Sequence, residues 1–213
     1  MNICKDNVLA RESTSAGRIS LPQINIPLEL QEMGVCHDAV CESVDKTYFG
    51  FRIPGLDFIR VEGFVFSHVA DEGIINACAG NLLRYRKLIG AENIQIFADI
   101  KKNTGKHNAH ALTADISVAE TASAAELFLA DGVVLTGTAT GLPADPGELR
   151  EVQHAVKIPV LIGSGVTLEN VKNYLDANAL IIGSYFKREG YWANGVDPDR
   201  VKKFMERISK LRE

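Results

Sequence analysis

Short apolar segments alternate with amphipathic segments along the chain from about residue 56 onward. Five of the apolar segments are rich in β-branched residues and have the length of buried strands: residues 58–62, 94–101, 133–138, 159–163 and 180–183. The segments between them have helical spacing, and the first places Ile74, Cys78, Leu82, Tyr85 and Ile89 on one stripe. Five strand–helix repeats predict parallel strands joined by crossover helices.

Helix-capping residues support this assignment. Ser117 and Glu120 have the spacing of a capping box, and Asp145 precedes a proline as Asp197 does. Thr167 is a further N-cap candidate before an apolar stripe. We therefore expect helices to begin at these positions, and the first helix to end at Gly90.

Residues 1–54 do not continue the pattern. Alternating apolar residues at positions 24–30 are interrupted by Pro27, which limits them to an edge or irregular strand. We expect an irregular N-terminal segment, residues 1–54, followed by five β/α units in residues 55–213.

The position of the glycines favours a barrel over an open sheet. The chain has no G-x-G-x-x-G and no P-loop motif. Its glycines instead follow the last three predicted strands, where barrels of parallel strands commonly bind phosphate. We predict an α/β fold, a parallel (β/α)₈ TIM barrel that is incomplete because three of its units are not recognisable. The unpaired strand edges would favour pairing with another chain, hence a homo-oligomer.

The two-residue period of a strand places polar residues on the inner face. Arg60 and Glu62 share one face of their strand, Asp99 and Lys101 share one face of the next, and Thr136 and Thr138 do so in the third. One interpretation is an ion-pair network that only fills the barrel. The other makes Glu62 or Asp99 a general base, with Lys101 as an electrophilic cation or a Schiff-base amine. Burial beside a carboxylate favours the charged form of lysine and hence the cation role.

Two Gly-Ser turns form a second candidate site. Backbone N–H groups of glycine turns can approach an anion closely, and serine hydroxyls add donors. A helix beginning at Thr167 would direct its N-terminus to the same place. We predict that these turns bind phosphate, although ordinary tight turns have the same composition; the candidate residues are Gly163, Ser164, Gly165, Gly183 and Ser184.

His107 and His110 follow Lys101 in a predicted loop. An H-x-x-H pair could bind a transition metal, but no third ligand is nearby in the sequence, so we predict no metal site and no cofactor. A loop over the barrel mouth would instead offer His110 as an acid/base group and His107 as a substrate contact. A solvated loop without function is the alternative.

Composition narrows the classes of partner. The chain of 213 residues carries 23 Lys+Arg against 27 Asp+Glu, a net charge of -4, and no basic block, which argues against nucleic-acid binding. No apolar run is long enough to span a bilayer. The four irregularly spaced cysteines predict a reducing compartment. We expect a cytoplasmic protein, with mitochondrial targeting by the N-terminus as the alternative.

Sequence blocks from residue 55 to residue 213 resemble the BtpA family. They are GLDFIRVEGFVFSHVADEG, FADIKKNTGKHNAHALTADIS, DGVVLTGTATGLPADP, IPVLIGSGVT and LIIGSYFKREGYWANGVDP, in this order. The resemblance implies a TIM barrel of the ribulose-phosphate-binding type. It also puts several candidate residues on family motif positions: Glu62, Asp99, Lys101, His107, His110, Thr136, Thr138, Ser164 and Ser184.

These observations predict an enzyme that binds a small phosphorylated substrate and acts by proton transfer, of the aldolase, isomerase or lyase type. The family's namesake is a cyanobacterial protein implicated in photosystem I biogenesis, which implies a rival function as a non-catalytic assembly or stability factor. The family's first three strands are not recognisable in residues 1–54, so an inactive truncated form, from a splice variant or a faulty gene model, is a third hypothesis.

Overall fold

The protein is built on a parallel sheet whose strands follow the predicted pattern. The computed structural model describes residues 2–3, 58–70, 73–101, 115–137 and 142–212. Its six-stranded sheet has the order β1-β8-β7-β6-β5-β2, and every pairing is parallel. The strands are β1 (Asn2–Ile3), β2 (Phe58–Val61), β5 (Gln95–Asp99), β6 (Gly132–Leu135), β7 (Val160–Ile162) and β8 (Ala179–Leu180). All five predicted strands are therefore confirmed, with ends shifted by a few residues.

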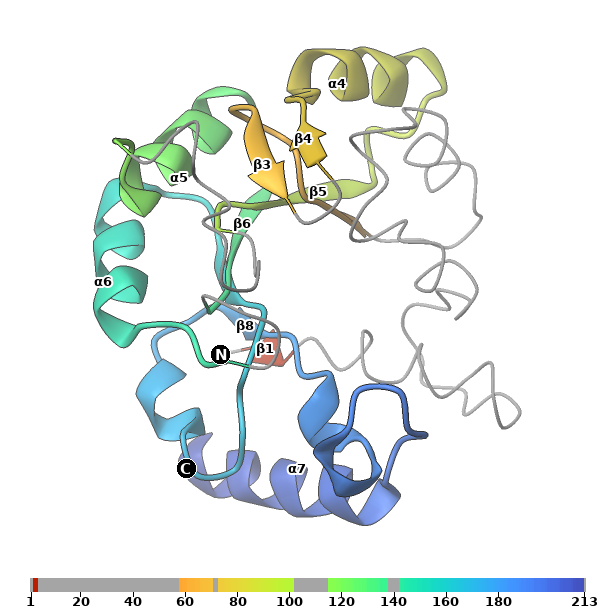
Figure 1. Ribbon diagram of the computed structural model, residues 1–213, viewed down its shortest axis with the longest axis vertical. Helices are drawn as coiled ribbons and strands as arrows, with labels where there is room; N and C mark the ends of the chain where they lie inside the picture. Colours follow the sequence, from red (N-terminus) through yellow and green to blue (C-terminus); the bar gives the residue numbers. More distant parts are fainter. Residues whose placement is uncertain (1, 4–57, 71–72, 102–114, 138–141, 213) are drawn as a thin grey trace.

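Helices cover the outside of the strands. They follow one another in an arc from α4 to α7 (Figure 1): α4 (Ala79–Leu88), α5 (Val118–Leu127), α6 (Pro146–Ala155) and α7 (Pro198–Arg212). Shorter elements complete the chain: the antiparallel pair β3 (His68–Ala70) and β4 (Gly73–Ile75), and the 3₁₀ turns η1 (Val171–Tyr174), η2 (Ser184–Phe186) and η3 (Arg188–Gly190).

The two faces of the sheet bury different sets of residues. The face toward the helices carries the larger apolar cluster, which includes Ile59, Ile96, Val133 and Ile162. The inner face carries a separate cluster: Phe58, Phe97, Val134, Leu161 and Ile181. This division confirms the alternation inferred from the sequence, because the buried polar residues Arg60, Glu62 and Thr136 continue the inner set toward the strand ends.

Local side-chain chemistry explains where the helices begin and end. The Ser117 hydroxyl accepts a hydrogen bond from the Glu120 N–H at 3.1 Å, and Glu120 accepts one from the Ser117 N–H at 2.8 Å, so α5 has the predicted capping box. Asp145 caps α6 by accepting from the Gly147 N–H at 2.7 Å. Helix α4 ends at Leu88, and after its C-cap Ile89 comes Gly90, which has the left-handed φ of 69° that this position favours.

Two predicted helices differ from the structure. Residues after Thr167 form a turn and the short η1 rather than an α-helix. The predicted cap at Thr167 is present, since its hydroxyl accepts from the Asn170 N–H at 3.4 Å and the Asn170 side chain accepts from the Thr167 N–H at 2.8 Å, but no α-helix follows it. The first helix begins later than predicted, because Ile74 belongs to β4 and pairs with Val69 instead of lying on the helical stripe.

The parallel α/β architecture is thus confirmed, while the closed barrel stays a prediction. Among the described strands, β1 and β2 stand at the two edges of the sheet and do not pair with each other. The last strand, β8, pairs with β1 near the N-terminus, the neighbour that an eight-stranded barrel would give it. Apart from β1, the predicted N-terminal segment lies outside the described residues.

Candidate functional site

The candidate residues gather at the carboxyl ends of the strands. Because β2 and β5 to β8 are parallel, the residues that follow each strand lie at one edge of the sheet. Glu62 follows β2, Asp99 ends β5, Thr136 follows β6, and Gly163 follows β7. Barrels and open sheets of parallel strands place their active sites at this edge.

Arg60 and Asp99 form a buried ion pair on the inner face. Arg60 Nε donates to Asp99 Oδ1 at 2.9 Å, and each side chain is 5% exposed. Burying a charge is costly unless it is paired, and this contact gives each of the two groups a partner. The two residues come from the neighbouring strands β2 and β5, which share a parallel register.

Glu62 lies beside a histidine for which sequence analysis predicted no role. The distance from His68 Nε2 to Glu62 Oε1 is 3.6 Å, and both residues are buried. His68 begins β3, directly after the chain leaves the sheet at Glu62. Both residues lie in one of the sequence blocks that resemble the family. No strand or helix periodicity links Glu62 to His68, so the sequence did not predict their contact.

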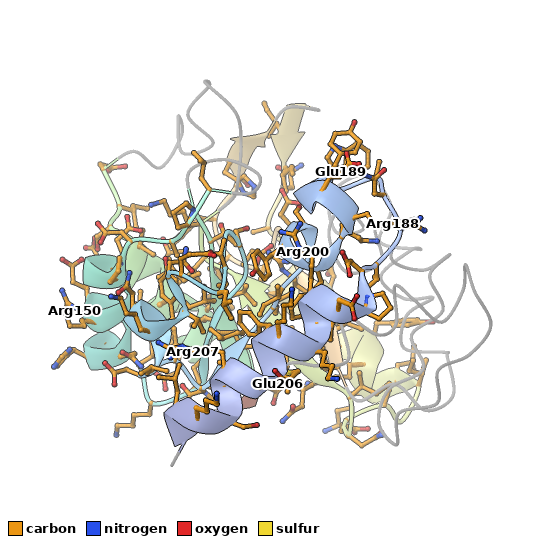
Figure 2. The ribbon with its side chains drawn as sticks, turned by 90° about the horizontal axis from the view of Figure 1, so that it is seen from below. Arg150, Arg188, Glu189, Arg200, Glu206 and Arg207 are labelled. Carbon is orange, nitrogen blue, oxygen red and sulfur yellow. The ribbon has the colours of Figure 1, made fainter. Side chains whose placement is uncertain are left out.

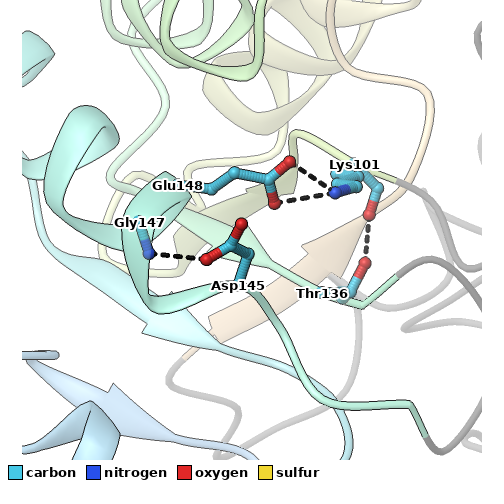
Figure 3. Close-up of polar contacts among 5 residues, drawn as sticks. All are labelled: Lys101, Thr136, Asp145, Gly147 and Glu148. Carbon is cyan, nitrogen blue, oxygen red and sulfur yellow. Dashed lines mark hydrogen bonds and ion pairs between the residues drawn. The ribbon is translucent and has the colours of Figure 1, made fainter.

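Lys101 binds a carboxylate of the outer layer (Figure 3). Its ammonium group donates to both carboxylate oxygens of Glu148, at 2.6 and 2.7 Å. Glu148 belongs to the first turn of α6, which Asp145 caps. The Thr136 hydroxyl donates to the Lys101 carbonyl oxygen. The ionic residues predicted from the sequence therefore lie at this edge of the sheet, and Lys101 is bound there to the first turn of α6.

The Gly-Ser turns lie at the ends of neighbouring strands. Gly163 and Ser164 follow β7, and Gly183 and Ser184 follow β8, with Ser184 as the first residue of η2. Gly165 has a second explanation: its φ is 63°, and a Cβ there would lie 2.3 Å from the backbone nitrogen of Pro143. The loop between β6 and α6 therefore requires glycine at this position, whatever the turn binds.

Three candidates cannot be placed. Thr138, His107 and His110 lie outside the described residues. Within the part of the chain that the structure describes, no group of three or more His, Cys, Asp and Glu side chains is arranged to hold a metal ion. Burial raises the pKa of the Cys78 thiol to about 12, so this cysteine is a poor nucleophile at neutral pH.

No helix among the described residues is long and apolar enough to cross a membrane.

The candidate site is built from two kinds of group at one edge of the sheet. Charged side chains come from β2, β5 and the β3 hairpin, and glycine turns come from β7 and β8. Such an edge can bind an anion through backbone N–H groups and move a proton through a carboxylate.

Comparison with known proteins finds relatives that cover most of this chain. It is 51% identical to an uncharacterized mitochondrial protein of Caenorhabditis elegans over 74% of its own length and 56% of that protein. It is 39% identical to an uncharacterized protein of Archaeoglobus fulgidus over 70% of its length and 56% of that protein.

A third relative, the photosystem I biogenesis protein BtpA of Synechocystis, is 35% identical over 73% of this chain and 53% of that protein. The chain thus spans a little over half the length of the curated relatives it matches. The sequence profile of the BtpA family matches residues 40–210. From this match and these identities, the chain belongs to the BtpA family.

Proposed function

We propose that this protein binds a small phosphorylated substrate at the carboxyl edge of its parallel sheet and transfers a proton on it. The reaction would be of the aldolase, isomerase or lyase type, in a (β/α)₈ barrel of the ribulose-phosphate-binding type. The observation that carries the proposal is the meeting of buried ionic side chains with two Gly-Ser turns at one edge of the sheet.

The phosphate group would be bound by the turns after β7 and β8. The backbone N–H of Gly183 and the hydroxyls of Ser164 and Ser184 would donate to its oxygens. Gly163 would allow close approach, because its own N–H already donates to the Leu135 carbonyl at 2.8 Å. The backbone of Gly165 would also contact the phosphate. Thr136, at the end of β6, would lie next to the turn that begins at Gly163. Thr138, His107 and His110 are proposed for this site on their sequence positions alone.

Glu62 is the carboxylate best suited to move the proton. Asp99 is held by Arg60, whose Nε donates to its Oδ1 at 2.9 Å, which ties this carboxylate to the sheet. Glu62 lies instead beside the imidazole of His68 at 3.6 Å, a group that can exchange a proton with it. Glu62 would take a proton from a carbon next to a carbonyl and return it to the neighbouring carbon or the same one. Lys101, held by Glu148, would contribute positive charge from the rim.

Deuterium exchange tests this chemistry without knowledge of the product. The protein is incubated in D₂O with a panel of phosphorylated aldoses and ketoses, and incorporation of deuterium next to the carbonyl is followed by NMR. We expect incorporation into at least one compound, and a loss of about 100-fold or more in the Glu62→Gln variant. Glu206→Gln is the matched control, because Glu206 is exposed on α7, on the outer layer (Figure 2).

Incorporation that is equal in the wild type and in Glu62→Gln would contradict the assignment of Glu62. Absence of incorporation across the panel, together with no binding of inorganic phosphate, would contradict the proposed enzyme class.

A second candidate function is a non-catalytic assembly or stability factor. It is favoured by the Synechocystis relative, which is named as a photosystem I biogenesis protein. Substitution of the matching glutamate in a full-length relative distinguishes the two. A variant that folds but no longer complements a deletion strain supports an enzyme, and full complementation supports the factor. The name of the Caenorhabditis elegans relative favours a mitochondrial over a cytoplasmic location for this chain.

An inactive truncated form is the remaining hypothesis. A cooperative thermal transition that rises with phosphate would argue against it, because a ligand at 100 times its Kd stabilises the folded state by about 2.7 kcal/mol. A chain with no cooperative transition would support it.

A further inference from the structure

Tyr191 and Trp192 form an exposed aromatic pair in the loop between β8 and α7. Their ring centroids lie 5.8 Å apart, with an interplanar angle of 45°. The exposed fraction is 54% for Tyr191 and 64% for Trp192, although aromatic side chains of this size are mostly buried in folded proteins. The pair therefore leaves apolar ring surface in contact with solvent, where a ligand can cover it.

The loop that carries the pair is fixed by its own hydrogen bonds. The Arg188 N–H donates to the Gly195 carbonyl at 2.9 Å, and the Arg188 carbonyl accepts from the Asn194 side chain at 3.0 Å. The Asn194 N–H donates in turn to the Tyr191 carbonyl at 3.1 Å. Glu189 has a left-handed φ of 58°, a strained conformation for a residue other than glycine. Strain of this kind is concentrated at ligand-binding and active sites.

The pair lies at the same edge of the sheet as the proposed phosphate site. The turns η2 and η3 link Ser184 to Tyr191 and contact each other. At the 3₁₀ rise of about 2 Å per residue, this segment is roughly 15 Å long. Figure 2 shows Arg188 and Glu189 beyond the first turn of α7, which carries Arg200. A ligand the size of a nucleotide can therefore extend from Ser184 toward the rings.

The size of the pair indicates a small ligand rather than another protein. A stable protein interface buries about 800 Å² on each partner, whereas two aromatic side chains offer at most about 500 Å². Among the described residues, the other exposed large hydrophobic side chains belong to other segments, such as Leu88 at the end of α4 and Leu127 at the end of α5.

Positive charge beside the rings favours an anionic ligand. Within residues 187–196, Lys187 and Arg188 outnumber Glu189. Arg200 adds a guanidinium group, since a Cβ built on Gly190 would lie 3.7 Å from Arg200 Nη2. Aromatic side chains stack on any flat heteroaromatic ring, because stacking requires only a π face. Rings and cations together are therefore suited to a phosphorylated compound that carries such a ring.

We propose that Tyr191 and Trp192 stack on a heteroaromatic ring of the substrate, which makes the substrate a nucleotide-like sugar phosphate. The phosphate would lie at the Gly183–Ser184 turn, and the sugar between this turn and the rings. This inference rests on the proposed function and deepens it, because it names the class of substrate.

Tryptophan fluorescence tests the proposal directly, because Trp192 is the single tryptophan of the chain. The full 213-residue protein is titrated with adenosine monophosphate (AMP), ribose 5-phosphate, adenosine and inorganic phosphate. We expect AMP to quench the fluorescence and to bind about 10-fold or more tightly than ribose 5-phosphate, which has the same phosphate without the ring. Adenosine should also quench but bind more weakly than AMP, because it lacks the phosphate.

Calorimetry with variants assigns the selectivity to the rings. Trp192→Ala should bind AMP no more tightly than ribose 5-phosphate, with wild-type affinity for ribose 5-phosphate. Trp192→Phe keeps a ring and should recover part of the difference. Phe128→Ala is the matched control, because Phe128 is an aromatic residue with an exposed fraction of 51% at the C-cap of α5, near the amino end of β6. It should bind all four compounds like the wild type.

Equal, measurable affinities of the wild type for AMP and ribose 5-phosphate, or wild-type selectivity in Trp192→Ala, would overturn this inference and leave the proposed phosphate site standing. Equal binding of AMP and adenosine, with no binding of ribose 5-phosphate or inorganic phosphate, would support the ring contact and contradict the phosphate site.

A wild-type protein that binds none of the four compounds would overturn the phosphate site and this inference together. Fluorescence that changes with protein concentration and with none of the compounds would overturn the inference in favour of a second copy of the chain on the rings.

Discussion

Two glycines of this chain adopt the same left-handed backbone conformation for different reasons. Gly90 has φ of 69° and follows the C-cap of α4, and a Cβ there would meet no atom within 4 Å. Gly165 has φ of 63°, but a Cβ there would lie 2.3 Å from the Pro143 nitrogen and 2.4 Å from the Leu142 carbonyl carbon. Only the second position combines backbone strain with a collision that cannot relax, because both colliding atoms belong to the backbone.

Alanine substitution at the two positions should therefore have unequal costs. We expect Gly90→Ala to lower the free energy of unfolding by about 1 kcal/mol, the cost of a left-handed alanine. Gly165→Ala should lower it by more than about 3 kcal/mol, because the loop between β6 and α6 must move. Urea unfolding of both variants measures the difference, and equal costs would contradict the packing described for Gly165.

The sequence predicted which ionic residues lie at the site, but it did not predict which residues each of them contacts. The period of the strands placed Arg60, Glu62 and Asp99 on the inner face, as the structure has them. It could not show that Lys101 pairs with Glu148, because that contact joins a strand end to a helix of the outer layer. His68 was missed for the same reason: a contact through space leaves no periodic trace in the sequence.

At the scale of elements, α5 shows how four residues determine a helix start. The Ser117 N–H and the Ser117 hydroxyl both donate to Glu120, which lowers the pKa of its carboxyl below the ordinary value of 4.5. The contribution of this pair to stability is present above that ordinary pKa and is lost as the pH falls through the lowered one.

Two serine substitutions at this helix should have unequal effects. Ser117→Ala removes the cap and should destabilise the protein by about 1 kcal/mol at pH 7. Ser123→Ala removes a long, exposed hydrogen bond of 3.4 Å to the Ala155 carbonyl, and the higher helix propensity of alanine should offset this loss and leave the stability nearly unchanged. Thermal melts at pH 7 and pH 3 measure both effects. An Ser117→Ala deficit that is larger at pH 3 would contradict the capping box.

The turn after β7 shows where local signals mislead. Thr167 followed by apolar residues at helical spacing predicts an α-helix. Thr167 and Asn170 exchange the reciprocal hydrogen bonds of a helix start, yet only η1 follows them. The phosphate site proposed at Ser164 therefore depends on turn amides and not on a helix N-terminus.

At the scale of the whole molecule, the inner face of the sheet changes character along the strands. Apolar residues fill it first, with the rings of Phe58 and Phe97 in contact at a centroid distance of 5.0 Å. Polar residues follow toward the carboxyl ends, where Arg60 of β2 pairs with Asp99 of β5. The apolar residues beneath the ionic groups lower the local dielectric constant, and electrostatic interactions of these groups are therefore stronger than in water.

The parallel sheet and its outer helices were predictable because their signals are periodic and local. Closure into a barrel depends on pairing between strands far apart in the chain, so it leaves no periodic signal and stays a prediction.

The central claim is that the carboxyl edge of this sheet binds an anion with residues from separate strands. Phosphate titration of the ¹⁵N-labelled protein, followed by amide chemical shifts, tests it most directly. We predict shifts at Gly163, Ser164, Gly183 and Ser184 that saturate with one shared Kd, and no shift at Asp131 or Gly132 at the opposite edge. Shifts confined to the amino ends of the strands, or shifts at the two turns with unrelated affinities, would contradict the claim.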